Sequence, residues 1–367
     1  MVKVAFIDDG ISRTHVPCDI HFENYIVDDG AIKANTPITH NSHGTACYSV
    51  FCNSIQSKYK LVSLKIVNTK TYTGNIYDLQ AALKWCGKHE VNLIHMSIGL
   101  QQMDDISTLY NIMKDLSDSG VIIVAACNNQ NTVTFPACFP MVIGVRHYDD
   151  EALMDTFIFH TTPFDQIEII TCAKDVVLLE SEDVFNLWDA GSSLAVPFIT
   201  AKICTFLENG CKGLDEVRQK LKTDSIKGNF YSSFLFYKSL FQEWKDIDVP
   251  IVVFCDESFE SLIGLFIFNG YNAVGLSKTK DTDICKYIYK FLNNDCSITE
   301  AMQLYHNFLL PDIIFLDADI DIAEIRPLVD ILVADSCKWN ILGENMVCLD
   351  INEPDINLYQ KIHDTLT

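Results

Sequence analysis

The sequence has little positive charge and none of the cysteine pairs that hold zinc. Its 367 residues include 27 Lys and Arg against 49 Asp and Glu, a net charge of −22. So acidic a chain offers no broad surface for phosphate groups, so neither nucleic acid nor an anionic membrane is an expected partner. The 14 cysteines form no Cys-x-x-Cys pair, which argues against a zinc knuckle, and a chain this long needs no disulfide scaffold.

Long apolar runs are also missing. No stretch approaches the length of a transmembrane helix. The N-terminal segment MVKVAFIDDG reaches Asp8 after a short apolar run, which is typical of a strand and not of a signal peptide. We therefore expect a cytoplasmic protein whose scattered thiols are reduced.

Strand-like and helix-like segments alternate through the first 225 residues. This alternation predicts an α/β fold, a parallel sheet with helices on both faces. The apolar, β-branched segments expected as strands are residues 2–7, 59–67, 91–96, 121–126 and 141–145, and helical spacing is found at 76–88, 105–118, 192–208 and 214–223.

A polar segment at 242–250 interrupts this pattern, which then restarts. We predict two domains, residues 1–240 and a smaller α/β domain at 249–367, with a helix at 282–292 in the second. The second domain has no glycine-rich phosphate loop and no second set of catalytic motifs. Its alternating acids Asp317, Asp319 and Asp321 are interpreted as a solvated strand end instead of a cation site.

Three separated segments carry residues suited to chemistry. Asp8 and Asp9 follow the first strand and precede a glycine; His43 lies among small residues; Ser192 and Ser193 open an apolar helix. Each has an ordinary structural interpretation: a turn-capping acid, a histidine at a helix start, and a serine N-cap. Each segment alone therefore predicts little.

Together, in the order Asp, His, Ser, the segments resemble the subtilisin-like serine proteases. Asp8-Asp9-Gly10, His43-Gly-Thr and Gly191-Ser-Ser193-Leu-Ala-Val-Pro197 are similar to that family's motifs, with Ser192 in place of a threonine. The resemblance covers residues 1–225 and implies Ser193 as nucleophile, His43 as general base and Asp8 as its carboxylate partner. It is closest to an intracellular form with an appended C-terminal α/β domain.

Further motifs imply an oxyanion donor and a substrate-binding region. The segment VIIVAACNN resembles the family's Ala-Ala-Gly-Asn strand, which makes Asn128 the side-chain oxyanion donor, with Cys127 in place of glycine. His95-Met-Ser-Ile-Gly99 resembles the Asn-Met-Ser-x-Gly stretch that pairs with substrate. By this resemblance the substrate-binding residues are Ser97, Ile98, Gly99, Ala125, Ala126 and Thr134, and Thr134 narrows the specificity pocket.

The resemblance implies a serine endopeptidase that acts through an acyl-enzyme. We expect it to process a specific peptide or precursor, as in leader removal during peptide maturation, with substrate or partner recognition by the second domain. The alternative is a catalytically silent scaffold of the same fold that binds a peptide or protein. No cofactor or metal is expected: calcium dependence is disfavoured because residues 51–60 lack a carboxylate. No N-terminal inhibitory propeptide is expected, since the motifs begin in the first strand.

Overall fold

The computed structural model describes residues 1–36, 38–67, 73–99, 106–161, 163, 165–181, 184–228, 230–255, 259–280, 282–283, 286–290, 297–317, 325–335 and 347–366. The chain divides into two compact units, Met1–Gly228 and Asn229–Thr367. No helix among these described residues is long and apolar enough to cross a membrane.

The first unit is built on a nine-stranded sheet in the order β3-β2-β4-β1-β5-β6-β7-β9-β8. All neighbouring strands are parallel except the edge pairs β2/β3 and β8/β9. The strands are β1 (Val2–Asp8), β2 (Phe22–Asp28), β3 (Ala31–Ala34), β4 (Tyr59–Lys65), β5 (Leu93–Met96), β6 (Ile122–Ala126), β7 (Val142–His147), β8 (Ile158–Phe159) and β9 (Ile169–Thr171). The predicted parallel sheet is thus confirmed.

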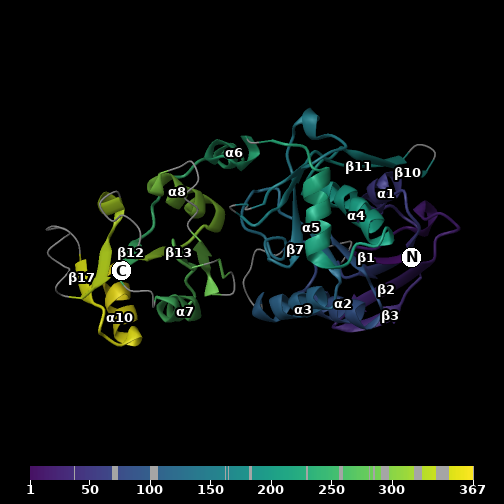
Figure 1. Ribbon diagram of the computed structural model, residues 1–367. Helices are drawn as coiled ribbons and strands as arrows, with labels where there is room; N and C mark the ends of the chain where they lie inside the picture. Colours follow the sequence, from purple (N-terminus) through teal and green to yellow (C-terminus); the bar gives the residue numbers. More distant parts are fainter. Residues whose placement is uncertain are drawn as a thin grey trace. The chain divides into compact units, whose positions relative to one another are not determined.

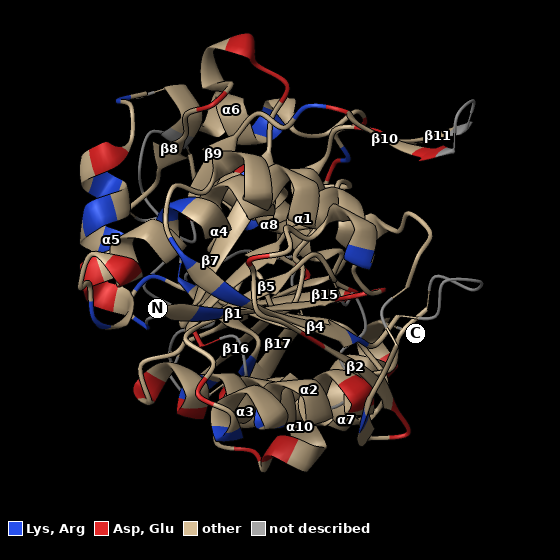
Figure 2. Cartoon of the chain, turned by 90° about the vertical axis from the view of Figure 1, so that its right-hand side faces the viewer, with Lys and Arg blue, Asp and Glu red and all other residues tan. Residues whose placement is uncertain are grey.

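Helices cover both faces of this sheet, as a parallel sheet buried on both sides requires. Figure 1 shows α1, α4 and α5 on one face and α2 and α3 on the other. The helices are α1 (His43–Ser54), α2 (Ile76–Lys88), α3 (Ile106–Asp118), α4 (Ser192–Glu208) and α5 (Gly213–Asp224). Charges of both signs lie along the outer surface of α5 (Figure 2), whose Val217 and Leu221 are buried.

A separate two-stranded hairpin, β10 (Val176–Ser181) and β11 (Val184–Trp188), precedes α4. Two of its cross-strand pairs, Val177 with Leu187 and Leu179 with Phe185, expose more than half of each side chain. The sequence analysis did not anticipate this hairpin.

The second unit has a six-stranded parallel sheet in the order β14-β13-β15-β12-β16-β17. Figure 1 shows α8 on one face and α7 and α10 on the other, and α6 contacts α8. Its elements are α6 (Phe234–Ser239), β12 (Ile251–Phe254), α7 (Glu260–Phe268), β13 (Ala273–Ser277), β14 (Ile288–Lys290), α8 (Ile298–Leu309), β15 (Ile313–Asp317), β16 (Ile331–Ala334), β17 (Val347–Asp350) and α10 (Asp355–Leu366). The order β14-β13-β15-β12-β16-β17 matches the order β3-β2-β4-β1-β5-β6 in the first unit. In each run the strands follow as third, second, fourth, first, fifth and sixth along the chain.

Some expectations for the second half are not met. The helix expected at 282–292 is wrong where residues are described, because β14 pairs there with β13. Asp317 is not solvated: it is 2% exposed and accepts hydrogen bonds from the Ser277 hydroxyl and the Lys278 main chain. Asp319 and Asp321 lie outside the described residues. Residues 229–240, placed by sequence in the first domain, belong to the second unit, where the Tyr237 ring contacts Phe308.

Candidate active site

Asp8 is the last residue of β1, the strand between β4 and β5. It is 4% exposed, because it ends a strand buried on both faces. The chain then turns at Gly10, whose φ of +106° favours glycine. The C-terminal end of a parallel strand is where α/β folds place functional groups.

His43 is the first residue of α1, and two acidic residues set its position differently. The carboxylate of Asp9 accepts the main-chain N–H of His43 at 3.2 Å and that of Gly44 at 2.8 Å, so it anchors the start of the helix. The carboxylate of Asp8 faces the ring, with Oδ2 at 3.0 Å from His43 Nδ1. Gly44 is required here, because a Cβ would lie 2.5 Å from the main-chain oxygen of Gly10.

Ser193 is the second residue of α4, one of the first-turn positions whose main-chain N–H a helix leaves unpaired. Pro197, four residues later, has no N–H to bond the main-chain oxygen of Ser193. That oxygen instead accepts hydrogen bonds from Ser97 Oγ at 3.2 Å and Cys47 Sγ at 3.4 Å. The proline therefore frees a carbonyl that ties α4 to α1 and to the segment after β5.

The contacts of Cys47 show how close the candidate residues lie. Its Sγ atom is 3.9 Å from Nε2 of His43 and 3.4 Å from the main-chain oxygen of Ser193, so the starts of α1 and α4 meet. Within the described part of the chain, no hydrogen bond reaches Ser193 Oγ, so the bond between this hydroxyl and His43 is not formed in this state. Catalytic hydrogen bonds often tighten only when substrate is bound.

The charges around His43 favour its protonated form. An ionised Cys47 would raise the pKa of His43 and the Asp8 carboxylate raises it, while burial lowers it. Burial raises the pKa of the Cys47 thiol, so at neutral pH the thiol is uncharged and Asp8 supplies the negative charge. Burial also raises the pKa of Asp8, but the charge and hydrogen bond of His43 outweigh it and leave that pKa below its ordinary value. An Asp8 carboxylate thus faces an imidazole of increased basicity.

Two adjacent asparagines follow β6, and their side chains make different contacts. The amide of Asn128 donates to Thr132 Oγ1 at 2.5 Å, and its Oδ1 accepts the N–H of Thr132 at 3.1 Å. The Oδ1 of Asn129 accepts the main-chain N–H of Ser192 at 2.9 Å. Asn128 therefore closes its own turn, whereas Asn129, which the sequence analysis passed over, lies against the start of α4.

The expected substrate-binding residues lie on two neighbouring segments. Ser97, Ile98 and Gly99 follow β5, and Ala125 and Ala126 end β6, which pairs with β5. The methyl carbon of Thr134 packs against Gly99, where a Cβ would lie only 2.5 Å from it. Thr134 is 1% exposed, and its hydroxyl accepts the N–H of Asn128 at 3.0 Å. Its methyl group therefore contacts the first segment at Gly99, and its hydroxyl bonds the turn that follows the second.

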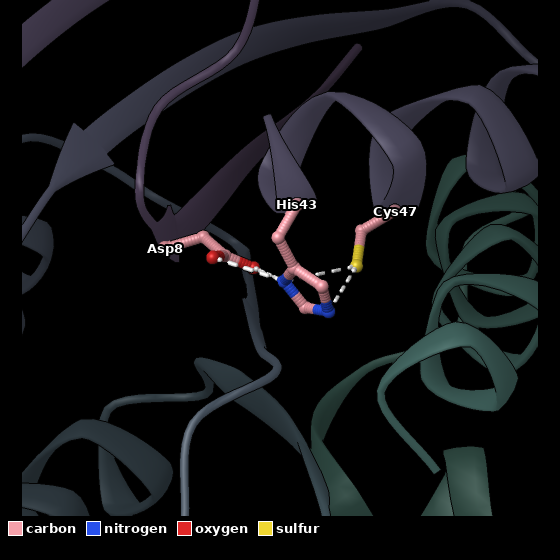
Figure 3. Close-up of side chains that lie close together, drawn as sticks. All are labelled: Asp8, His43 and Cys47. Carbon is pink, nitrogen blue, oxygen red and sulfur yellow. Dashed lines mark hydrogen bonds and ion pairs between the residues drawn. The ribbon is translucent and has the colours of Figure 1, made fainter. Parts of the chain in front are cut away.

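Figure 3 shows a thiol beside the Asp8–His43 pair. Within the described residues, Asp8, His43 and Cys47 are the one group of three metal-ligand side chains whose donor atoms all lie within 4.8 Å of one another. The group does not fit a metal ion, because Cys47 Sγ lies beside the ring, 3.8 Å from Nδ1 and 3.9 Å from Nε2, and not along the Nδ1 lone pair that faces Asp8. The sequence analysis missed Cys47, although its position four residues after His43 puts both on one helix face.

Comparison with known proteins finds one matching sequence family and several similar structures. The sequence model described as the subtilase family matches residues 1–212. The structure is similar to a cold-adapted subtilisin-like serine proteinase, with 17% identity, 60% of this chain and 81% of that chain covered, and a TM-score of 0.48. It is also similar to the prenylagaramide maturation protease PagA, with 18% identity, 63% of this chain and 85% of that chain covered, and a TM-score of 0.45. A lanthipeptide protease is similar with 15% identity, 59% of this chain and 78% of that chain covered, and a TM-score of 0.47. No curated protein matches the sequence.

Proposed function

Because the chain belongs to the subtilase family, we propose that it is a serine endopeptidase with Asp8, His43 and Ser193 as its catalytic triad. The observation that carries the proposal is the 3.0 Å contact between His43 Nδ1 and the Asp8 carboxylate, with the start of α4 beside the same ring. This arrangement supports acyl transfer, because an acid-oriented imidazole accepts the proton of a nearby hydroxyl.

In the proposed reaction His43 Nε2 takes the Ser193 hydroxyl proton as Oγ attacks the substrate carbonyl. The same proton passes to the leaving amine, and water then hydrolyses the acyl-enzyme by the reverse sequence. The Asp8 carboxylate accepts a hydrogen bond from Nδ1–H of His43, so that the Nε2 lone pair faces the serine. The same carboxylate stabilises the imidazolium that forms. The N–H of Ser193, in the first turn of α4, is one proposed donor to the oxyanion.

For the side-chain oxyanion donor, the contacts favour Asn129 over Asn128. The Asn128 amide is already bonded to Thr132, and its Oδ1 accepts two main-chain N–H groups. Asn129 uses only Oδ1 at the start of α4, so within the described residues its Nδ2 has no acceptor, and the amide lies 2.9 Å from a Cβ built on Gly191. We therefore propose Asn129 for the role that the sequence resemblance gave to Asn128.

For the substrate, we propose that the enzyme processes a specific peptide or precursor. The second folded unit, with its own six-stranded sheet, supports a role in recognising substrate or partner. The segment Ser97-Ile98-Gly99 is proposed to pair with the substrate backbone as an added strand. Mass spectrometry of products from a proteome-derived peptide library tests this: cleavage within one narrow sequence class supports it, and broad cleavage contradicts it.

The decisive test of activity is labelling with a fluorophosphonate, which phosphonylates an activated serine oxygen as fluoride leaves. The intact chain should label at Ser193, and Ser193→Ala and His43→Ala should both abolish labelling, with hydrolysis reduced about 10⁶-fold. Ser192→Ala is the matched control, because Ser192 neighbours the nucleophile but its Oγ bonds the N–H of His147. A folded chain that does not label is instead the catalytically silent scaffold.

A further inference from the structure

The hairpin β10–β11 presents an apolar surface to solvent. Four large side chains on one side of the ribbon, each 54% to 63% exposed, form what we call the hairpin face: Val177, Leu179, Phe185 and Leu187. On the other side of β10, the buried side chains pack into the core of the first unit. A polar outer side would keep that packing, so the fold does not explain an apolar one. Apolar side chains gathered in one exposed patch mark an interaction site.

The hairpin itself carries only negative charge. Residues 175–191 contain five Asp and Glu and no Lys, Arg or His, and Figure 2 shows acidic residues and no basic ones on the two strands. A second copy of the chain, with its net charge of −22, would meet this surface with charge of the same sign. A partner that carries Lys or Arg beside apolar side chains is attracted instead.

A cleft of about 430 Å³ adjoins the hairpin face, between β10, α1 and α4, and Val177 lines both. The apolar part of its lining includes Val50, Leu194 and Phe198. The carboxylates of Asp155 and Asp175 also line it, with one ammonium, Lys174 Nζ, which pairs with Asp155 at 2.9 Å. The cleft therefore combines apolar walls with a net negative charge. A Lys or Arg side chain suits it, because its aliphatic stem packs on apolar residues while its charged end meets a carboxylate.

The hairpin is tied to both helices that carry the proposed catalytic residues. Asn41, two residues before His43, donates from Nδ2 to the main-chain oxygen of Leu178 at 3.4 Å and to Asn186 Oδ1 at 3.0 Å. Strand β11 ends at Trp188, four residues before α4 begins at Ser192. A peptide bound to the hairpin is therefore held beside the proposed active site.

We propose that the hairpin face and the adjoining cleft dock a segment of the substrate away from its scissile bond, in which apolar side chains alternate and a Lys or Arg is adjacent; this rests on the proposed function. An extended peptide places every second side chain on one side, about 6.6–6.8 Å apart. Val177 and Leu179 have the same two-residue spacing, and the basic side chain enters the cleft at Val177. Docking stabilises substrate and transition state equally, so it lowers KM and leaves kcat unchanged.

The binding test uses the full-length Ser193→Ala chain, which keeps the hairpin and lacks the proposed nucleophile. The probe is a fluorescent peptide, Lys-Ile-Thr-Val-Thr-Leu-Lys, whose binding is read by anisotropy. Replacement of its lysines by glutamate, or of its apolar residues by serine, should each weaken binding at least about 10-fold. The double variant Leu179→Thr/Leu187→Thr, which keeps β-propensity, should do the same. Ile226→Thr is the matched control, because it removes an exposed apolar side chain outside the hairpin, and it should bind like the parent.

The charge preference is tested at Glu180, an exposed residue of β10. At low salt, Glu180→Lys should weaken binding of the lysine probe and strengthen binding of the glutamate probe, each by about 3-fold, the size of effect that an exposed charge pair produces. Both changes should shrink at high salt, because exposed charges are screened. Equal changes of the same sign for both probes would contradict the preference for a basic partner.

The effect on turnover is measured on the chain with Ser193 intact. A cleavable peptide chosen from the library products should have a KM at least about 10-fold lower when the probe sequence is attached through a Gly-Ser linker, with kcat unchanged. Leu179→Thr/Leu187→Thr should remove this difference and leave fluorophosphonate labelling intact.

Three results overturn the docking surface. They are the absence of probe binding to the parent, equal probe affinity in the parent and in Leu179→Thr/Leu187→Thr, and a parent dimer that this double variant dissociates in sedimentation, since the hairpin face would then join two copies. If fluorophosphonate labelling fails but the probe binds as expected, the peptidase proposal is wrong and the peptide-binding surface stands.

Discussion

The side-chain oxygen of Asn129 accepts the main-chain N–H of Ser192 at 2.9 Å, directly before the proposed nucleophile. This bond joins the turn after β6 to the start of α4, although the two residues are 63 positions apart in the sequence. The Asn128 side chain instead bonds within its own turn, to Thr132. The Asn129 side chain therefore lies against the start of α4, and the Asn128 side chain closes the turn after β6.

These two asparagines should differ sharply on substitution. We expect Asn129→Ala to lower kcat about 10²- to 10³-fold with little change in KM, because an oxyanion donor acts mainly in the transition state. Asn128→Ala should lower the melting temperature and reduce kcat by a much smaller factor. Steady-state kinetics of both variants on one peptide checks this. A kcat loss confined to Asn128→Ala would return the oxyanion role to Asn128.

Substitution of Asp8 tests the orientation of the imidazole. We expect Asp8→Asn to reduce kcat by about 10⁴-fold, because an amide that donates to Nδ1 stabilises the wrong tautomer of His43. Asp9→Asn is the comparison, since the Asp9 carboxylate accepts the main-chain N–H groups of His43 and Gly44, whereas the Asp8 carboxylate bonds the ring. It should cost stability more than turnover. If Asp9→Asn inactivates the folded enzyme and Asp8→Asn does not, the two acids have been assigned the wrong way round.

Much of this architecture was predictable, because the central strands are continuous apolar runs. The segments ending at Asp8, Met96 and Ala126 have the pattern of strands buried on both faces, and all three are strands. The hairpin β10–β11 was not predicted: its outward side chains are as apolar as its inward ones, so period-2 alternation is missing. The helix expected at 282–292 was wrong because a short parallel edge strand, β14, has no distinctive periodicity.

The site was partly predictable for a similar reason. Asp8, His43 and Ser193 lie at a strand end and at two helix starts, positions that sequence patterns locate well. Asn128 stays the prediction from sequence and Asn129 the proposal from the contacts, because a turn after a strand can present either of two adjacent side chains. The sequence places Cys47 one helical turn after His43 and indicates nothing further about its contacts. The Cys47 thiol also contacts the main-chain oxygen of Ser193. That contact requires α1 and α4 to meet, and a single sequence does not show how two helices pack.

Activity should rise with pH through the pKa of His43. The general base must be neutral, and the Asp8 carboxylate raises the pKa of the imidazole, so activity is lost as pH falls through that raised value. The acid limb of kcat/KM should therefore lie above the ordinary histidine value of about 6.5. In Asp8→Asn, with that charge removed, the limb of the residual activity should move to lower pH. A limb that stays in place in this variant contradicts the assignment of Asp8 as the charged partner.

The Thr134 side chain should restrict the residue before the scissile bond. Its methyl group packs against Gly99, in one of the two segments expected to line the pocket, so we expect small substrate side chains to be preferred there. Thr134→Ser removes that methyl while keeping the hydroxyl that accepts the Asn128 N–H. It should raise kcat/KM for larger side chains by about 10-fold relative to alanine, the size of effect a methyl group produces in an apolar pocket. A parent enzyme that prefers bulky residues would contradict this account.

His95 should make the first unit sensitive to acid. The ring is fully buried, stacks on Phe6 with centroids 4.2 Å apart, and bonds Ser97 and Thr200. Burial lowers the pKa of His95 to about 3, whereas an unfolded histidine titrates near 6.5. Below pH 6.5 the unfolded chain therefore binds a proton that the folded chain excludes. The stabilisation is complete above that value and is lost as pH falls, by about 1.4 kcal/mol per pH unit.

Replacement of this histidine should flatten that dependence. In His95→Asn, between pH 6 and 4, the free energy of unfolding of the first unit should change by about 1.4 kcal/mol less per pH unit. Urea unfolding at each pH, read by pulsed hydrogen exchange in peptides from β1 and β5, isolates this unit from the second. The exposed His40 gives the control, since His40→Asn removes a histidine from solvent and not from the core. An equal slope in His95→Asn and in the parent would mean that the buried ring is already protonated.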